Sequence, residues 1–308
     1  MFKKENICVL ISSLGFTEFD RKMCTLIRHA GFDKVGVTIL GGMIVDVRKT
    51  ANNICKYSFD HFCGDIPDVN WNYKRLVYDW EMVNRDRSKK SCIDWLKRVI
   101  IQMGIWRLYS VIDKKMLISK INVLVENTKD IVGKKWIRWD SRGVIENLDI
   151  LDSIQPDLNI VVEYYPESHH PYVFPKFIQK LNEDYKQNFW ISIDPGHFHR
   201  AKYLYSDCRN IRAEYWVENY LWEPDIAGLI RMIEISNLQV CGQNAHNSVF
   251  DGVIDFERVF GLLGKGLNKR KIDPPFFWVI EATPLSKDEL CNNMERKLNI
   301  YYKKLING

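Results

Sequence analysis

Short runs of β-branched and aromatic residues recur along the chain, and segments with the apolar spacing of helices follow most of them. The expected strand and helix pairs are 7–12 with 18–30, 34–40 with 45–54, 159–164 with 174–185, 238–241 with 256–263, and 277–281 with 287–304, with one further strand at 189–194. Such alternation is typical of a parallel sheet covered by helices.

The late strands are apolar almost throughout, as expected for strands that are buried on both faces. Three of them end in a carboxylate, at Glu163, Asp194 and Glu281. In a parallel barrel the carboxyl ends of the strands meet at one mouth, where barrel enzymes carry their catalytic groups. The alternative is a doubly wound sheet, but Ser12-Ser-Leu-Gly-Phe16 lacks the glycine pattern of a dinucleotide-binding turn. We therefore predict an α/β chain forming one (β/α)8 TIM barrel domain over residues 1–308.

Composition and charge exclude several classes of protein. The 308 residues are 46% hydrophobic and 27% charged, which is typical of a globular chain. The net charge of +5 is small and the basic residues are scattered, so we expect no nucleic-acid partner. No apolar run is long enough to cross a bilayer, and we expect no membrane partner. Eight cysteines stand singly without a CxxC pair, which indicates reduced thiols and a cytoplasmic location.

Several motifs stand in a characteristic order in the second half of the chain. A strand end at Glu163 precedes Asp194-x-x-His197, then His246 followed by Gly252-Val-Ile-Asp-Phe256, and finally the strand end at Glu281. This order resembles the xylose isomerase-like barrel superfamily, which contains sugar and sugar-phosphate isomerases and epimerases and the apurinic endonucleases of the same fold. The resemblance covers nearly the whole chain.

The resemblance implies one divalent metal ion, held by Glu163, Asp194, His246 and Glu281. Three carboxylates and one imidazole suit Mn²⁺ best, with Mg²⁺, Co²⁺ or Zn²⁺ as alternatives. The interval from Asp194 to His246 is longer than one barrel unit, so we predict an insertion between strands 6 and 7. Residues 200–222, rich in Tyr and Trp, are the candidate for it and are expected to form a lid or an interface.

The resemblance also implies chemistry. Glu163 and Glu281 would form the general acid/base pair, and His197 would bind a substrate hydroxyl or a developing oxyanion. The expected enzyme is a metal-dependent isomerase or epimerase of a small sugar, sugar phosphate or related polyhydroxy carbonyl compound, acting through a metal-stabilised enediolate. Whether the substrate is phosphorylated and whether the protein is a homo-oligomer stay open.

Other functions and site assignments also remain open. An apurinic endonuclease-like phosphodiesterase is one alternative, although the chain has only seven histidines for a site with several zinc ions. A divergent barrel with a lyase, modifying or binding role is another. A carboxylate after a strand is often a helix N-cap, and His246 lies among amides that suit a structural histidine. Glu126, in Val123-Leu-Val-Glu-Asn-Thr128, is the rival to Glu163, and His61 is predicted to end an early strand.

Overall fold

A computed structural model gives the structure of the chain. It describes residues 7–10, 25, 27–29, 32, 34–38, 61–66, 136–146, 148–154, 159–235, 237, 252–270 and 277–280.

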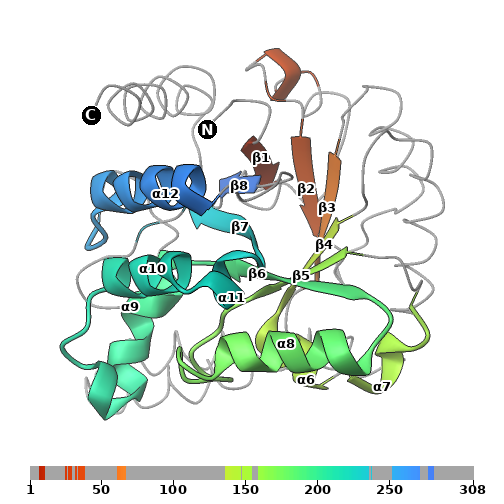
Figure 1. Cartoon of the computed structure of the whole chain (residues 1–308). Coiled ribbons are helices and arrows are strands. Elements are labelled where there is room, and N and C mark those ends of the chain that lie inside the picture. The colour runs from red at the N-terminus through yellow and green to blue at the C-terminus, as the bar shows by residue number, and fades with distance from the viewer. Residues whose placement is uncertain are drawn as a thin grey trace, which may run out of the picture.

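Eight parallel strands close into a barrel in chain order, with β1 paired to β8 (Figure 1). The strands are β1 Ile7–Leu10, β2 Lys34–Thr38, β3 His61–Ile66, β4 Trp136–Asp140, β5 Asn159–Glu163, β6 Asn188–Ile193, β7 Ile230–Ile235 and β8 Phe277–Ile280. The predicted TIM barrel is thus confirmed, and its strands span residues 7–280.

The buried strands explain why the chain closes on itself. Every residue of β5 is buried, and the side chains of Ile160, Val161 and Val162 have no exposed surface. A strand that is apolar on both faces needs cover on both, and in a barrel the interior and the outer helices provide it.

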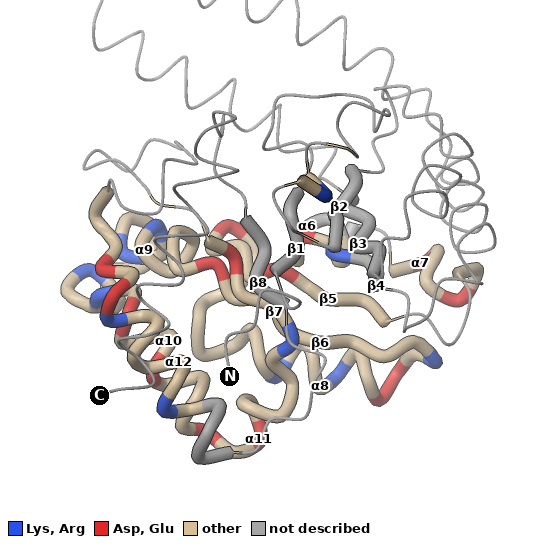
Figure 2. The backbone as a smooth tube through the Cα atoms, turned by 90° about the horizontal axis from the view of Figure 1, so that it is seen from above, with Lys and Arg blue, Asp and Glu red and all other residues tan. Residues whose placement is uncertain are grey.

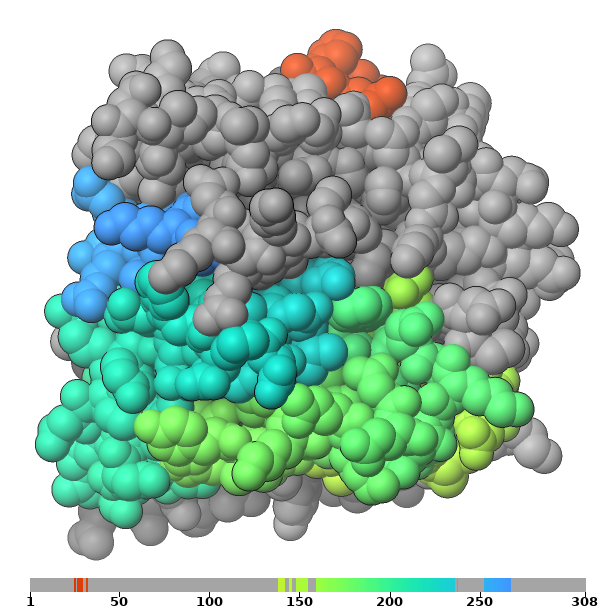
Figure 3. All heavy atoms as spheres, viewed as in Figure 1, coloured from red at the N-terminus to blue at the C-terminus, as the bar shows by residue number. Residues whose placement is uncertain are grey.

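Helices form the layer outside the strands (Figure 1). They are α6 Ser141–Glu146, α7 Leu148–Leu151, α8 Phe174–Asp184, α9 Pro195–Leu204, the 3₁₀ turn η3 Ser206–Cys208, α10 Ala213–Trp222, α11 Pro224–Ala227 and α12 Phe256–Arg270. In the space-filling view the described residues between β5 and β7, green to teal, lie next to one another on the lower half of this face (Figure 3). The charged residues of α10 are both acidic, Glu214 and Glu218, whereas α12 carries Glu257 as well as the basic Arg258 and Lys265 (Figure 2).

The segment predicted to be an insertion, residues 200–222, lies between β6 and β7, where α9, η3, α10 and α11 follow one another. The long interval that suggested an insertion was counted to His246, whereas β7 already begins at Ile230. Residues 200–222 form the end of α9, then η3 and α10, and α10 packs against α9 and α12. Its side chains Trp216, Val217 and Leu221 are fully buried. Most of the segment therefore belongs to the packed outer layer, and a lid or interface role for it stays a prediction.

Two strand assignments from the sequence are wrong. The seventh strand is Ile230–Ile235 and not 238–241, a segment that lies outside the described residues. His61 begins β3 instead of ending it, which places it at the rim opposite the carboxyl ends of the strands. The predicted helices 45–54 and 287–304 also lie outside the described residues.

Among the helices that the structure describes, none combines the length and the apolar character required to cross a membrane.

Candidate functional site

Three of the predicted site residues lie at the mouth of the barrel, at the end of β5 and where β6 passes into α9. Glu163 is the last residue of β5. Asp194 follows β6 directly and caps α9, because its Oδ1 accepts a hydrogen bond of 2.7 Å from the Gly196 amide. His197 lies in the first turn of that helix. The N-cap interpretation of Asp194 is therefore correct, and the cap also places His197 beside Glu163.

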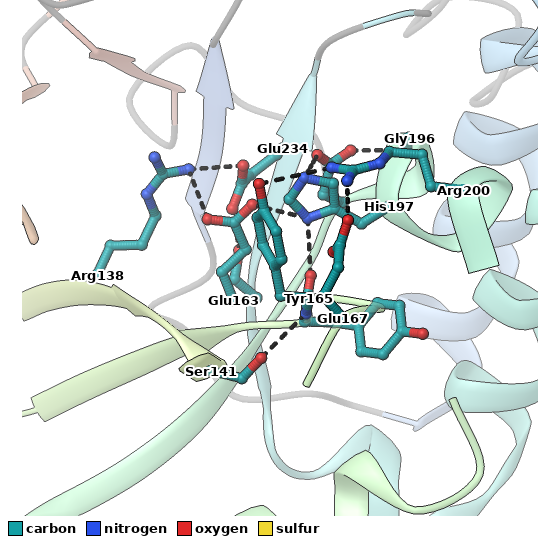
Figure 4. Close-up of polar contacts among 12 residues, drawn as sticks. Arg138, Ser141, Glu163, Tyr165, Glu167, Gly196, His197, Arg200 and Glu234 are labelled. Carbon is teal, nitrogen blue, oxygen red and sulfur yellow. Dashed lines mark hydrogen bonds and ion pairs between the residues drawn. The ribbon is translucent and has the colours of Figure 1, made fainter. Parts of the chain in front are cut away.

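The side chains of these three residues converge, and Figure 4 shows Glu163 and His197 side by side. His197 Nδ1 is 3.0 Å from Glu163 Oε1, and His197 Nε2 is 3.5 Å from Asp194 Oδ2. All three residues are buried, and one ligand atom from each lies within 4.8 Å of the others. Glu163, preferred over Glu126 in the sequence, thus lies next to Asp194, while Glu126 is outside the described residues.

The hydrogen bonds of His197 define which ring nitrogen carries the proton. The carbonyl oxygen of Tyr164 lies 2.8 Å from Nδ1 and can only accept, so Nδ1 donates. Burial, the largest cause, lowers the pKa of His197 and favours the neutral ring. In the neutral ring Nε2 is then an acceptor, and it faces a carboxylate oxygen. A hydroxyl donor or a cation placed between them would satisfy both atoms.

A second pair of charges spans the interior of the barrel. Arg138 on β4 places Nη1 2.6 Å from Glu234 Oε2 and 3.5 Å from Glu163 Oε2. Glu234 lies on β7, and its Oε1 accepts a 2.8 Å hydrogen bond from Ser192 Oγ. The strands β4 and β7 are not neighbours in the barrel, so this ion pair crosses the interior. Arg138 and Glu234 are only 3% and 0% exposed.

The sequence analysis missed both members of this pair. The signal for Glu234 was present, because a glutamate near the end of the apolar run Ile230-Arg-Met-Ile-Glu-Ile235 repeats the pattern that singled out Glu163. For Arg138 the available signal was a lone cation between the tryptophans of Trp136-Ile-Arg-Trp-Asp140.

An aromatic ring and a further ion pair border the site on the side of α9. The Tyr165 ring lies edge-on to His197, with centroids 4.2 Å apart. The guanidinium of Arg200 lies 5.3 Å from the centroid of that ring and donates to the carboxylate of Glu167. The Tyr165 amide donates to Ser141 Oγ over 3.1 Å, which ties this loop to the start of α6. The loop after β5 is thus held in place on both sides.

The residues around this site fit a divalent cation. Glu163 and Asp194 supply hard oxygen ligands within reach of one another. The buried carboxylates of Glu163, Asp194 and Glu234 lie near one buried guanidinium, that of Arg138. Arg200 at the border is balanced by Glu167, so the group carries net negative charge. Buried like charges are unfavourable unless a cation balances them.

The other two predicted ligands are outside the described residues. Strand β8 ends at Ile280, one residue before Glu281, while β7 ends at Ile235, well before His246. His246 therefore lies well past the end of β7 in the chain, and the acidic residue near that strand end is Glu234. Metal binding by His246 and Glu281 stays a prediction.

A separate cluster joins His170, Asp207 and Cys208. His170 Nε2 is 3.2 Å from both Asp207 Oδ1 and Cys208 Sγ. The Tyr172 amide donates to His170 Nδ1, so Nε2 carries the proton of the neutral ring and points it at the cluster. Burial raises the pKa of the Cys208 thiol to about 11, against the thiolate that a nucleophile or a metal ligand needs. We interpret this cluster as a hydrogen-bonded structural contact.

The closed parallel barrel, with its polar groups at the carboxyl ends of the strands, has the fold of the xylose isomerase-like TIM barrels. No protein-family model matches the sequence, and no curated protein matches it significantly. The match is to solved structures, and at the identities below it shows the fold alone.

D-Allulose 3-epimerase from Methylomonas sp., solved in complex with D-allulose, has a TM-score of 0.52 and 12% identity over 98% of this chain and 99% of that one. A xylose isomerase domain containing protein from Salmonella typhimurium LT2 has a TM-score of 0.52 and 12% identity, over 97% and 98% of the two chains. A xylose isomerase-like TIM barrel/4-hydroxyphenylpyruvate dioxygenase fusion protein has a TM-score of 0.53 and 10% identity, over 98% of this chain and 43% of that one.

Proposed function

We propose that the protein is an isomerase or epimerase of a small polyhydroxy carbonyl compound, a free sugar or a sugar phosphate. The observation that supports this function is the buried convergence of Glu163, Asp194 and His197 at the carboxyl ends of β5 and β6. The fold shared with a D-allulose 3-epimerase points to the same class of reaction.

Glu163 is the proposed general base. Its Oε1 faces His197 and its Oε2 faces Arg138, so both carboxylate oxygens are held in a defined direction. A fixed carboxylate at hydrogen-bonding distance can remove the proton from the carbon that bears a hydroxyl next to the substrate carbonyl. Return of the proton to the other face or to the neighbouring carbon, with Glu281 as the partner acid, gives epimerisation or isomerisation.

His197 is the proposed substrate-binding group. With Nδ1 donating to the Tyr164 carbonyl, Nε2 accepts a hydrogen bond from a substrate hydroxyl. Of the two roles expected from the sequence, hydroxyl binding agrees better with this tautomer than donation to an oxyanion. The neighbouring Tyr165 ring offers an apolar wall for the carbon skeleton of a sugar.

A divalent metal ion, with Mn²⁺ as first choice, is part of the proposal. Glu163 and Asp194 would hold it, together with the predicted ligands His246 and Glu281. When bound it would polarise the carbonyl and stabilise the negative charge that develops on its oxygen.

The test is solvent deuterium exchange. The purified protein, with and without Mn²⁺, is incubated in heavy water with a panel of ketoses and ketose phosphates, and deuterium at carbon is followed by NMR. We expect exchange next to the carbonyl of at least one compound, and loss of that exchange after chelation. Exchange with none of them would contradict the isomerase or epimerase function, and incision of abasic DNA by the same sample would favour the phosphodiesterase alternative.

A further inference from the structure

Arg138 makes a buried ion pair across the interior of the barrel. It lies on β4 in register with Asp65 of β3 and Val161 of β5. Glu163 pairs with Asp140, so Arg138 lies farther from the carboxyl ends of the strands than Glu163 does. From there its guanidinium reaches across to Glu234 on β7 at 2.6 Å and passes Glu163 at 3.5 Å (Figure 4). The shorter contact shows that Glu234 is its main partner.

Both oxygens of Glu234 are engaged by groups of the chain. Oε2 is paired with Arg138, and Oε1 accepts from Ser192 Oγ over 2.8 Å. The charge of this carboxylate is balanced by the guanidinium, and each oxygen already has one partner, so its attraction for a metal ion is weakened. The guanidinium also repels a second cation placed close to it.

Glu163 lies between the two halves of the site. One oxygen faces the guanidinium, whereas the other faces His197, which in turn contacts Asp194. The side of the mouth away from Arg138 therefore holds two carboxylates, those of Glu163 and Asp194. The guanidinium that borders this side, that of Arg200, is paired with Glu167.

We propose that Arg138, by pairing with Glu234, keeps Glu234 from coordinating a metal ion. A divalent ion is thereby confined to the side of the barrel mouth formed by Glu163 and Asp194. The proposal rests on the metal site of the proposed function and assigns roles to Arg138 and Glu234. Arg138 is a positioning residue, because it acts through the two glutamates.

The test is Mn²⁺ affinity, measured by calorimetry on the purified full chain without substrate. Arg138→Met releases the Glu234 carboxylate and removes the repelling guanidinium, so we expect Mn²⁺ to bind about tenfold tighter or more. The double variant Arg138→Met/Glu234→Leu removes the pair as a neutral unit, so we expect its affinity to stay within about threefold of the wild type. Circular dichroism confirms folding of each variant.

Three results would overturn the proposal. One is a folded Arg138→Met protein that binds Mn²⁺ no better than the wild type. Another is a tenfold or larger loss of affinity in the double variant, which would show that Glu234 is a ligand. The third is an Arg138→Met protein that stays unfolded at millimolar Mn²⁺, because a released metal site should gain stability from the ion.

The same titrations separate this proposal from the proposed function. A wild type that binds no Mn²⁺, beside an Arg138→Met variant that does, would contradict both the confinement of an ion by Arg138 and the metal dependence of the natural enzyme. Wild-type binding without any sugar exchange would leave the metal site standing and contradict the isomerase or epimerase activity.

Discussion

At the scale of single residues, Asp194 combines a helix cap and a proposed metal-binding role in one carboxylate. Oδ1 caps α9 through the Gly196 amide, and Oδ2 faces His197. The cap fixes the first turn of α9, and the first turn carries His197 to Glu163. The helix cap at Asp194 therefore helps to set the distance between His197 and Glu163.

Asp194→Asn separates the two tasks. Asparagine caps a helix about as well as aspartate, so we expect a change of less than about 1 kcal/mol in the free energy of unfolding. The lost charge should weaken Mn²⁺ binding at least about tenfold. Urea unfolding and calorimetry measure the two effects. Asp194→Ala should lose both the cap and the metal, and an Asn variant with unchanged affinity would show that Asp194 serves only as a cap.

We expect one buried histidine, His199, to make the stability of the fold depend on pH. It is 9% exposed, and burial, followed by the charge of Lys202, lowers its pKa to about 4. The unfolded chain takes up this proton near pH 6.5 whereas the folded chain does not, so stability is lost as the pH falls from about 6.5 towards 4. With solvent screening the loss is about 1–2 kcal/mol.

The measurement is urea unfolding at several pH values. His199→Gln should flatten the curve between pH 6.5 and 4, and His29→Gln, at an exposed side chain, is the matched control. An unchanged slope in the His199 variant would show that this histidine does not couple protonation to folding.

At the scale of elements, α10 and α12 pack closely at one glycine. A methyl group on Gly266 of α12 would lie 3.1 Å from Leu221 Cβ of α10, whereas one on Gly261 would meet nothing within 4 Å. Gly261→Ala should therefore stabilise the protein by about 0.5–1 kcal/mol through helix propensity. Gly266→Ala has the same gain but crowds Leu221, so we expect it to be neutral or destabilising by about 1 kcal/mol.

Thermal unfolding of the two variants tests this contact, and each serves as the control for the other. Equal stabilisation by both substitutions would show that α10 and α12 are farther apart at Leu221 than the structure places them.

The elements also show what the sequence can and cannot predict. Strands β5 and β6 were predicted because an apolar run ending in a carboxylate is a local signal, and helix α8 was predicted from its apolar spacing. The seventh strand was predicted at 238–241 instead of Ile230–Ile235 because Arg231 and Glu234 interrupt the apolar run of β7. The partnership of Arg138 and Glu234 could not be predicted, since it depends on the distance across a closed barrel between strands far apart in the chain.

At the scale of the whole molecule, the Arg138–Glu234 pair joins opposite parts of the barrel wall. Removal of one partner leaves a buried charge, so Arg138→Met without metal should cost about 3–5 kcal/mol of unfolding free energy. Arg138→Met/Glu234→Leu replaces both charges with apolar groups and should regain most of that loss. Urea unfolding in the presence of a chelator measures both. A double variant no more stable than the single one would mean that the packing of these side chains, and not their charge, holds the wall together.

The central claim is that Glu163 moves a proton at the mouth of the barrel, and deuterium exchange into the best substrate of the panel tests it most directly. Glu163→Gln keeps the size of the side chain but cannot accept the proton, so the exchange rate should fall about 10²–10⁴-fold. The control Glu183→Gln, on the exposed face of α8, should exchange at the wild-type rate. A Glu163→Gln protein that is folded and exchanges deuterium as fast as the wild type would contradict the account.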